Sequence, residues 1–173
     1  MNRTVRYQTA VNILIVLIVL LPSTLFSQES SSTSADMQWN DLKEAQTEAR
    51  EHGKKVLIYS RAEWCHYCKK MEDEVFPRQE IRNMMKKYFY PVMIDIDSDA
   101  RITFNGETMT ENGFAREFQV SATPTLFFVD EKGEMLGRQP GYIPPEIFKK
   151  LLAYIGTEAY SEMKFKEYLE KEQ

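Results

Sequence analysis

Two cysteines separated by two residues lie between a short apolar run and a helical pattern, and this arrangement constrains the fold more than any other feature of the chain. The apolar run, residues 56–59, is rich in strand-forming residues and has the length of a buried strand. After Cys68, the apolar residues Met71 and Val75 recur at a spacing of four, which is typical of a helix. We therefore expect Cys65 where a strand ends and a helix begins.

A thiol at that position has a particular chemistry. The first turn of a helix carries unpaired amide donors and about half a positive charge, which favours a thiolate over a thiol. Cys65 is therefore expected to be the attacking thiol. Cys68 follows three residues later on the same face of the turn, close enough to attack a mixed disulfide formed at Cys65 and to release the partner.

Two other uses of the cysteine pair explain the sequence less well. A structural disulfide stabilises a fold mainly by closing a long loop, and a gap of two residues closes almost none. A structural zinc site needs about four Cys or His ligands, whereas only His66 and the distant His52 could join the two thiolates. We expect no metal and no cofactor other than the redox-active Cys65–Cys68 disulfide itself.

The N-terminus predicts export. Arg3 and Arg6 precede an uninterrupted apolar run at residues 13–21, and small or polar residues follow it, as in a signal peptide. The run is shorter than the roughly 20 apolar residues that cross a bilayer comfortably. We expect residues 1–27 to be a signal peptide that is removed during export to the periplasm, with an uncleaved N-terminal membrane anchor as the alternative.

The charge of the chain describes its surface more than its function. The formal net charge is -4, and removal of residues 1–27 takes away two arginines and no acids, which leaves 20 basic against 26 acidic residues, or -6. Nucleic acid is therefore not an expected partner. The chain length of 173 residues allows one ordinary domain after the N-terminal segment. We expect a flexible linker at residues 28–36, one domain at residues 37–156 and a helical tail at residues 157–173.

The remaining strands follow the same apolar pattern as residues 56–59. They are predicted at residues 90–95, 125–130 and 135–139. The last two are joined by a turn that contains Gly133, so they are expected to pair antiparallel.

Helices are predicted between these strands. They are expected at residues 41–51, where Asn40 is the predicted cap, and at residues 80–88, 112–118 and 145–154. The tail is expected to dock on the domain through Tyr160, Phe165 and Leu169. Strands that alternate with helices indicate an α/β layered fold with a mixed sheet.

Several separated motifs in this order resemble the thioredoxin family. WCHYCK at residues 64–69 is similar to the family's Trp-Cys-x-x-Cys-Lys, TPT at residues 123–125 to its cis-proline loop, and FFVDEKGEM followed by Gly141 to its last hairpin. The resemblance covers roughly residues 39–155. It implies the thioredoxin fold, a mixed central β-sheet flanked by helices, here with an extra N-terminal helix and a C-terminal helical tail.

A narrower resemblance rests on three further features. The insert at residues 102–113, the phrase QPGYIPPEIFKKLLAYI and the charged tail are similar to exported thioredoxin-related proteins associated with periplasmic thiol reduction. This likeness implies cysteine-containing exported proteins as substrates and a membrane thiol-electron donor as the source of electrons.

Carried onto this sequence, the resemblance implies roles for individual residues. Cys65 is the nucleophile, and Cys68 resolves the mixed disulfide. Trp64 forms an apolar lip beside them. A cis peptide bond before Pro124 would leave the backbone of Thr123 free to pair with an extended substrate strand.

Gly141 would let a third loop approach the site without a side chain. The residues between the two cysteines, His66 and Tyr67, are candidates for tuning the stability of the thiolate. A protonated His66 would favour the reduced protein and make the disulfide more oxidising. The alternative for His66 is a solvent-facing side chain of no consequence, and Tyr67 is more often a packing residue.

One position departs from the family. Many thioredoxins bury an aspartate six residues before the first cysteine, where it helps to move the proton of the resolving thiol, and Tyr59 occupies that place here. Glu63 lies nearer in sequence but is expected to point to solvent, so a bound water is the other candidate for this task.

These features predict an exported, monomeric thiol-disulfide oxidoreductase that reduces disulfides of exported proteins. A thiol oxidant or disulfide isomerase is the first alternative, although isomerases usually add a dimerisation domain for which this chain has no room. A redox-inert binding module is the second alternative, and the presence of both cysteines argues against it.

Overall fold

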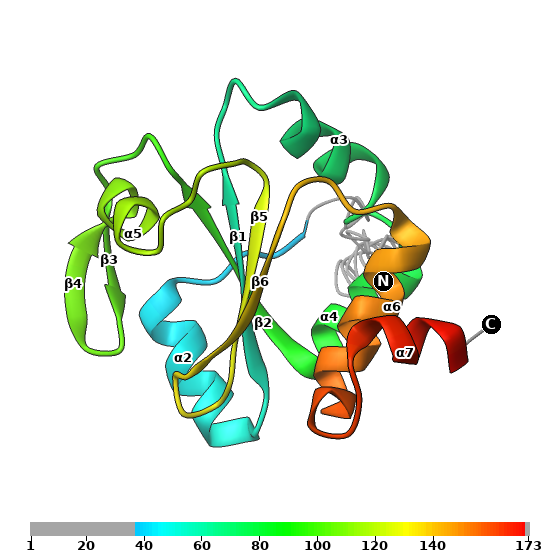
Figure 1. The fold of residues 1–173 in the computed structure, drawn as a ribbon. Coiled ribbons are helices and arrows are strands. Elements are labelled where there is room, and N and C mark those ends of the chain that lie inside the picture. The colour runs from blue at the N-terminus through cyan, green and yellow to red at the C-terminus, as the bar shows by residue number, and fades with distance from the viewer. Residues whose placement is uncertain (1–36, 172–173) are drawn as a thin grey trace, which may run out of the picture. The chain divides into compact units, whose positions relative to one another are not determined.

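A mixed four-stranded sheet organises the part of the chain that the computed structural model describes, residues 37–171 (Figure 1). Its strand order is β2-β1-β5-β6. β1 (Lys55–Arg61) pairs in parallel with β2 (Phe89–Asp95) and antiparallel with β5 (Thr125–Val129), which pairs antiparallel with β6 (Met135–Pro140). The predicted mixed sheet and its last hairpin are confirmed.

Helices cover both faces of this sheet. They are α2 (Leu42–His52), α3 (His66–Glu74), α4 (Gln79–Tyr88), α5 (Glu111–Glu117) and α6 (Pro145–Gly156). In Figure 1, α2 and α5 lie on one side of the strands and α4 and α6 on the other.

The alternation of side chains along β1 explains the two layers. Leu57 and Tyr59 belong to a buried cluster that includes both cysteines and residues of α3, α4 and α6. Val56 and Ile58 belong to a second cluster with residues of α2, β2, β5 and α5. Every residue from 55 to 60 is buried, so β1 is a central strand with a core on each face.

A separate hairpin fills the predicted insert. β3 (Arg101–Phe104) and β4 (Glu107–Thr110) form a two-stranded antiparallel sheet. The connecting residues Asn105 and Gly106 both have positive φ, 52° and 86°, as a type I′ turn requires. This hairpin was not predicted, although an Asn-Gly pair between two short strands is the strongest local indication of one.

The start of α2 differs from the prediction. Asp41, not Asn40, caps the helix, because its carboxylate accepts the amide of Glu44 at 3.0 Å. The backbone and side-chain amides of Asn40 instead donate to the carbonyl of Pro91, at 2.9 and 2.8 Å. Asn40 therefore ties the chain to β2, the edge strand of the sheet.

The tail forms two short pieces instead of one helix. They are a 3₁₀ turn, η1 (Ala159–Ser161), and α7 (Phe165–Lys171). The predicted contacts of Tyr160 and Phe165 are present, since both rings pack against Tyr154 of α6. Tyr168, which was not predicted, makes the third aromatic contact, while Leu169 is half-buried.

The predicted signal peptide at residues 1–27 and the predicted linker at residues 28–36 lie outside the described residues. Among residues 37–171, no helix is both long enough and apolar enough to cross a membrane.

Candidate functional site

The strand register brings three separate segments to one end of the sheet. Ser60 near the end of β1 pairs with Thr125 at the start of β5, and Thr125 pairs with Pro140 at the end of β6. The segments that leave β1, enter β5 and leave β6 therefore meet there, and Figure 1 shows them at the end where α3 begins. These segments carry every site residue that the sequence predicts.

The two cysteines form a disulfide at the start of α3. Cys65 is the residue immediately before the helix, with a Cα–Cα distance of 5.2 Å to Cys68. The amide of Cys68 donates to the sulfur of Cys65 at 3.1 Å. The same amide and the helix dipole would stabilise a thiolate at Cys65 after reduction.

The two sulfur-bearing residues differ in their access to solvent. Cys65 is 4% exposed and Cys68 is 0% exposed. Cys65 is therefore the more accessible of the two residues.

Two aromatic residues next to the cysteines in the sequence are exposed. Trp64 is 70% exposed and donates from its indole Nε1 to Asp97 at 2.7 Å. Tyr67 is 57% exposed, with its ring 5.9 Å from His66 and 6.2 Å from Tyr142. Such rings offer apolar contact area to a bound polypeptide.

The loop that enters β5 is tied to the loop that leaves β6. The Thr123–Pro124 peptide bond is cis. The carbonyl of Pro124 accepts the amide of Gly141 at 2.7 Å. Gly141 has a φ of +85°, a conformation that favours glycine. Thr123, Pro124 and Gly141 thus form one continuous rim, while the side chain of Thr125 holds the loop by donating to the carbonyl of Ala122 at 2.7 Å.

A polar cluster lies behind Cys68. The hydroxyl of Tyr59 is 3.1 Å from the carbonyl of Cys68 and 3.1 Å from a carboxylate oxygen of Glu72. The same oxygen accepts from Arg61 at 2.9 Å, and Arg61 also contacts Asp95 at 3.3 Å. Burial, followed by the negative charge of Glu72, raises the pKa of Tyr59 well above its usual range. Tyr59 therefore acts as a donor, and Glu72 supplies the carboxylate.

Glu72 was missed by the sequence analysis. It lies four residues after Cys68, so the two share a face of α3, and this spacing is the indication that could have found it. Glu63, the carboxylate considered at first, is exposed as expected. Glu72 also lines a surface cavity of about 310 Å³, together with Arg61 and Trp39. The carboxylate therefore has access to solvent.

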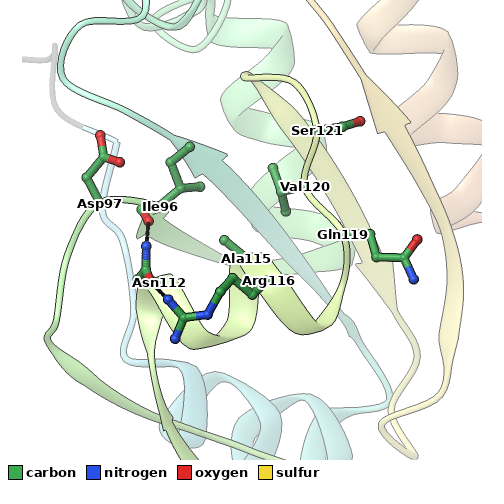
Figure 2. Close-up of a pocket in the computed structure, with 8 residues that line it drawn as sticks. All are labelled: Ile96, Asp97, Asn112, Ala115, Arg116, Gln119, Val120 and Ser121. Atoms are coloured by element: carbon green, nitrogen blue, oxygen red, sulfur yellow. Dashed lines mark hydrogen bonds between the residues drawn. The ribbon is translucent and has the colours of Figure 1, made fainter.

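A second cavity is lined by eight residues that include Asp97, the hydrogen-bond partner of Trp64 (Figure 2). Its volume is 320 Å³, and Ile96, Ala115 and Val120 provide the apolar part of its lining. The polar lining residues are Asp97, Asn112, Arg116, Gln119 and Ser121.

Two hydrogen bonds hold this cavity in shape. Asn112 donates to the carbonyl of Ile96 at 2.7 Å and accepts from Arg116. Ser121 lies two residues before Thr123 in the sequence, so the cavity reaches the segment that carries the cis-proline loop. Its volume has room for a side chain.

No metal centre is evident in this region. Among residues 37–171, no group of three His, Cys, Asp or Glu side chains is arranged to hold a metal ion.

A disulfide at the start of a helix, on a mixed sheet with a cis-proline loop beside it, defines a thioredoxin-like protein. Residues 42–156 match the family model described as a thioredoxin-like domain. The chain belongs to this family.

Individual relatives agree with this placement. The chain is 25% identical over 113 residues to the disulfide bond reductase DsbH of Chlamydia pneumoniae, covering 64% of this chain and 66% of DsbH. It is 30% identical over 98 residues to the thiol:disulfide interchange protein DsbD of Actinobacillus pleuropneumoniae serotype 5b (strain L20), covering 56% of this chain but 15% of DsbD. The match therefore spans less than two thirds of either relative.

A solved structure is similar over a comparable region. A thioredoxin-fold protein from Helicobacter pylori superimposes with a TM-score of 0.60 at 25% identity, covering 69% of this chain and 80% of that one. The predicted fold class is confirmed by this likeness and by the sheet described above.

Proposed function

We propose that this protein is a thiol-disulfide oxidoreductase that reduces disulfides of exported proteins. The observation that carries the proposal is the unequal access to the two cysteines, together with the amide hydrogen bond to the sulfur of Cys65. One sulfur is placed to be attacked or to attack, and the other is held behind it.

The reaction runs in two exchanges. The thiolate of Cys65 attacks one sulfur of the substrate disulfide, the substrate S–S bond breaks, and the other substrate sulfur leaves as a thiolate that takes up a proton. Cys68 then loses its proton and attacks the sulfur of Cys65, which releases the second substrate thiolate and forms the Cys65–Cys68 disulfide. Two electrons pass to the substrate, and a membrane thiol-electron donor restores the dithiol.

The rim of the site supports a polypeptide substrate. An extended segment would pair with the backbone of Thr123 beside Pro124, with Gly141 allowing close approach on one side. Trp64 would cover its apolar side chains on the other side. The cavity of Figure 2 would take a neighbouring side chain of the same segment.

Export and direction belong to the same proposal. The protein would act in the periplasm as a monomer, either free or anchored by residues 1–27. The names of the relatives support this direction, since DsbH is described as a disulfide bond reductase. His66 and Tyr67 would tune the stability of the thiolate, and Glu72 would take the place of the carboxylate that the family places at Tyr59.

Insulin reduction by the purified protein tests the activity. We expect the wild type to reduce insulin with dithiothreitol as the electron source, and Cys65→Ser to be inactive. Cys68→Ser should accumulate a mixed disulfide with its target, because the first exchange proceeds and the second cannot. A wild type as inactive as Cys65→Ser would favour the redox-inert binding module.

The reduction potential tests the direction. Equilibration with glutathione should give a value above that of thioredoxin, about -270 mV, and below that of the strongest periplasmic oxidant, about -120 mV. A reduction potential near about -120 mV would favour a role as a thiol oxidant. It would contradict the proposed direction of the reaction but not the thiol-disulfide exchange itself.

A further inference from the structure

A basic cavity lies at the end of the sheet opposite the disulfide. It has a volume of 340 Å³ and is formed by α2, the tip of the β3–β4 hairpin and the β5–β6 turn. The turn follows Val129, the last residue of β5, whereas the disulfide lies beyond the first residue of that strand. The two sites are therefore separated by the length of the strand.

One asparagine fixes the walls of this cavity. The amide of Gln46 in α2 donates to the side-chain oxygen of Asn105 at 2.6 Å, and the backbone amide of Asn105 donates to Gln46 at 3.0 Å. The side chain of Asn105 also donates to the carbonyl of Gly133 at 2.9 Å. Gly133 is needed there, because a Cβ would collide with the Asn105 side chain. The helix, the hairpin tip and the turn are thus joined before any ligand arrives.

Three cationic side chains line the cavity, and no acidic side chain does. They are Lys43 and Arg50 of α2 and Lys132 of the turn. Within the described residues, none of the three has a carboxylate within 4.0 Å, in contrast to Lys55, Arg61, Lys70 and Arg78. This cluster of unpaired positive charges, on a protein of net charge -4, favours the binding of an anion.

Asp130, two residues before Lys132, is already engaged within its own turn. The carboxylate of Asp130 accepts the backbone amides of Lys132 and Glu134, at 2.9 and 2.7 Å. It therefore stabilises its own turn and leaves the ammonium group of Lys132 to the cavity.

We propose that this cavity binds a phosphate group. Arginine matches two oxygens of a phosphate at once, and lysine contributes a point charge. A phosphomonoester carries about 1.5 to 2 negative charges at neutral pH, which suits three cations better than a single carboxylate does. The group belongs either to a soluble phosphate compound or to the headgroup of an anionic lipid, since both present the same oxygens.

Isothermal titration and vesicle flotation distinguish the two sources. The first uses inorganic phosphate, and the second uses vesicles with and without phosphatidic acid. Saturable binding of phosphate alone assigns a soluble ligand, and flotation only with phosphatidic acid assigns the lipid. Binding should weaken as salt is raised. Absence of both kinds of binding overturns the proposal.

The variant Lys43→Gln/Arg50→Gln/Lys132→Gln should bind at least about tenfold more weakly, because all three charged contacts are lost. The matched control is Lys149→Gln/Lys164→Gln/Lys166→Gln, which removes the same charge from exposed positions on α6 and before and within α7. The control should bind as the wild type does. Equal losses in both variants would show that net charge alone is responsible and would overturn the site.

A third variant tests the walls of the cavity independently of its three charged side chains. Asn105→Gly keeps a residue that accepts positive φ but removes the side-chain bonds to Gln46 and Gly133. It should weaken phosphate binding with all three cations present. Insulin reduction should be unchanged in every variant, because the disulfide lies at the other end of the sheet, and this readout also reports that each variant is folded.

Discussion

Tyr59 holds two parts of the site together through one hydroxyl group. Its oxygen lies 3.1 Å from both the Cys68 carbonyl and the Glu72 carboxylate, inside a core where its ring stacks on Trp39 and meets the edge of Phe76. The raised pKa of this phenol means that its proton stays in place over the whole range in which thiol exchange operates.

We predict that Tyr59→Phe lowers the free energy of unfolding by about 1 kcal/mol at neutral pH, since one buried hydrogen-bonding group is lost while Arg61 still contacts Glu72. The folded protein binds the Tyr59 proton more tightly than the unfolded chain does. The stabilisation that comes from this tighter proton binding is therefore complete below the pKa of tyrosine in the unfolded chain, about 10. It is lost as the pH rises above that value.

Urea unfolding at pH 8 and pH 10.5 measures this difference. The stability of the wild type should fall more steeply than that of Tyr59→Phe over this interval. Parallel losses in the two proteins would contradict the assigned pKa direction. Tyr90, Tyr154 and Tyr160 also have raised pKa values, mainly from burial, and they are common to both proteins.

At the scale of single residues, the sequence predicted the reactive cysteines better than the side-chain contacts that surround them. The positions of Cys65 and Cys68 follow from their spacing and from the strand and helix on either side. The contact between Tyr59 and Glu72 could not be predicted in the same way, because it joins a strand to a helix through side chains whose directions depend on the packed fold. The same holds for the Trp64–Asp97 contact, which spans 33 positions along the chain.

Helices α4 and α6 pack closely enough to require a glycine at the end of α6. A Cβ at Gly156 would lie 2.5 Å from the ring carbon Cγ of Tyr88 and 2.8 Å from its Cβ. The second of these atoms is next to the backbone, so rotation of the side chain cannot remove the conflict.

We predict that Gly156→Ala lowers the free energy of unfolding by about 1 kcal/mol. Overpacking costs about 1–3 kcal/mol, and the better helix propensity of alanine recovers at most about 1 kcal/mol at this terminal position. Gly137→Ala in β6 is the control, because no atom lies within 4 Å of the added Cβ. Chemical denaturation of both variants measures the effect, and a stabilised Gly156→Ala would show that the helices separate without cost.

At the scale of elements, the predicted strands and helices agree with the structure to within about two residues at most ends, because apolar periodicity and turn residues mark them. The β3–β4 hairpin was missed, since its strands are only four residues long and half exposed. The cap of α2 was placed one residue early, because Asn40 and Asp41 are equally good capping residues by type. Only the contact of Asn40 with Pro91 decides between them.

The C-terminal tail is fastened to the start of the central sheet by a buried cation. The side chain of Lys55, at the first position of β1, is 4% exposed and contacts Glu158 at 2.8 Å. Glu158 lies just before η1, so one ion pair connects the first strand to the last segment of the described chain.

We predict that Glu158→Gln lowers the free energy of unfolding by about 1–2 kcal/mol. Removing one partner leaves a buried charge unpaired, at a cost of about 3–5 kcal/mol when both groups are buried, and the exposure of Glu158 reduces that figure. Glu162→Gln, at an exposed position in the same tail, is the control. Thermal or urea unfolding measures both variants, and identical stabilities would mean that water replaces the carboxylate at no cost.

The inaccessibility of Cys68 has a consequence for the order of events in solution. Of the two cysteines, Cys65 is the more accessible. If exchange with both partners proceeds at Cys65, as proposed, the protein that delivers electrons and the protein that accepts them would use the same face in turn. An excess of either one would then inhibit the cycle by occupying the face that the other needs.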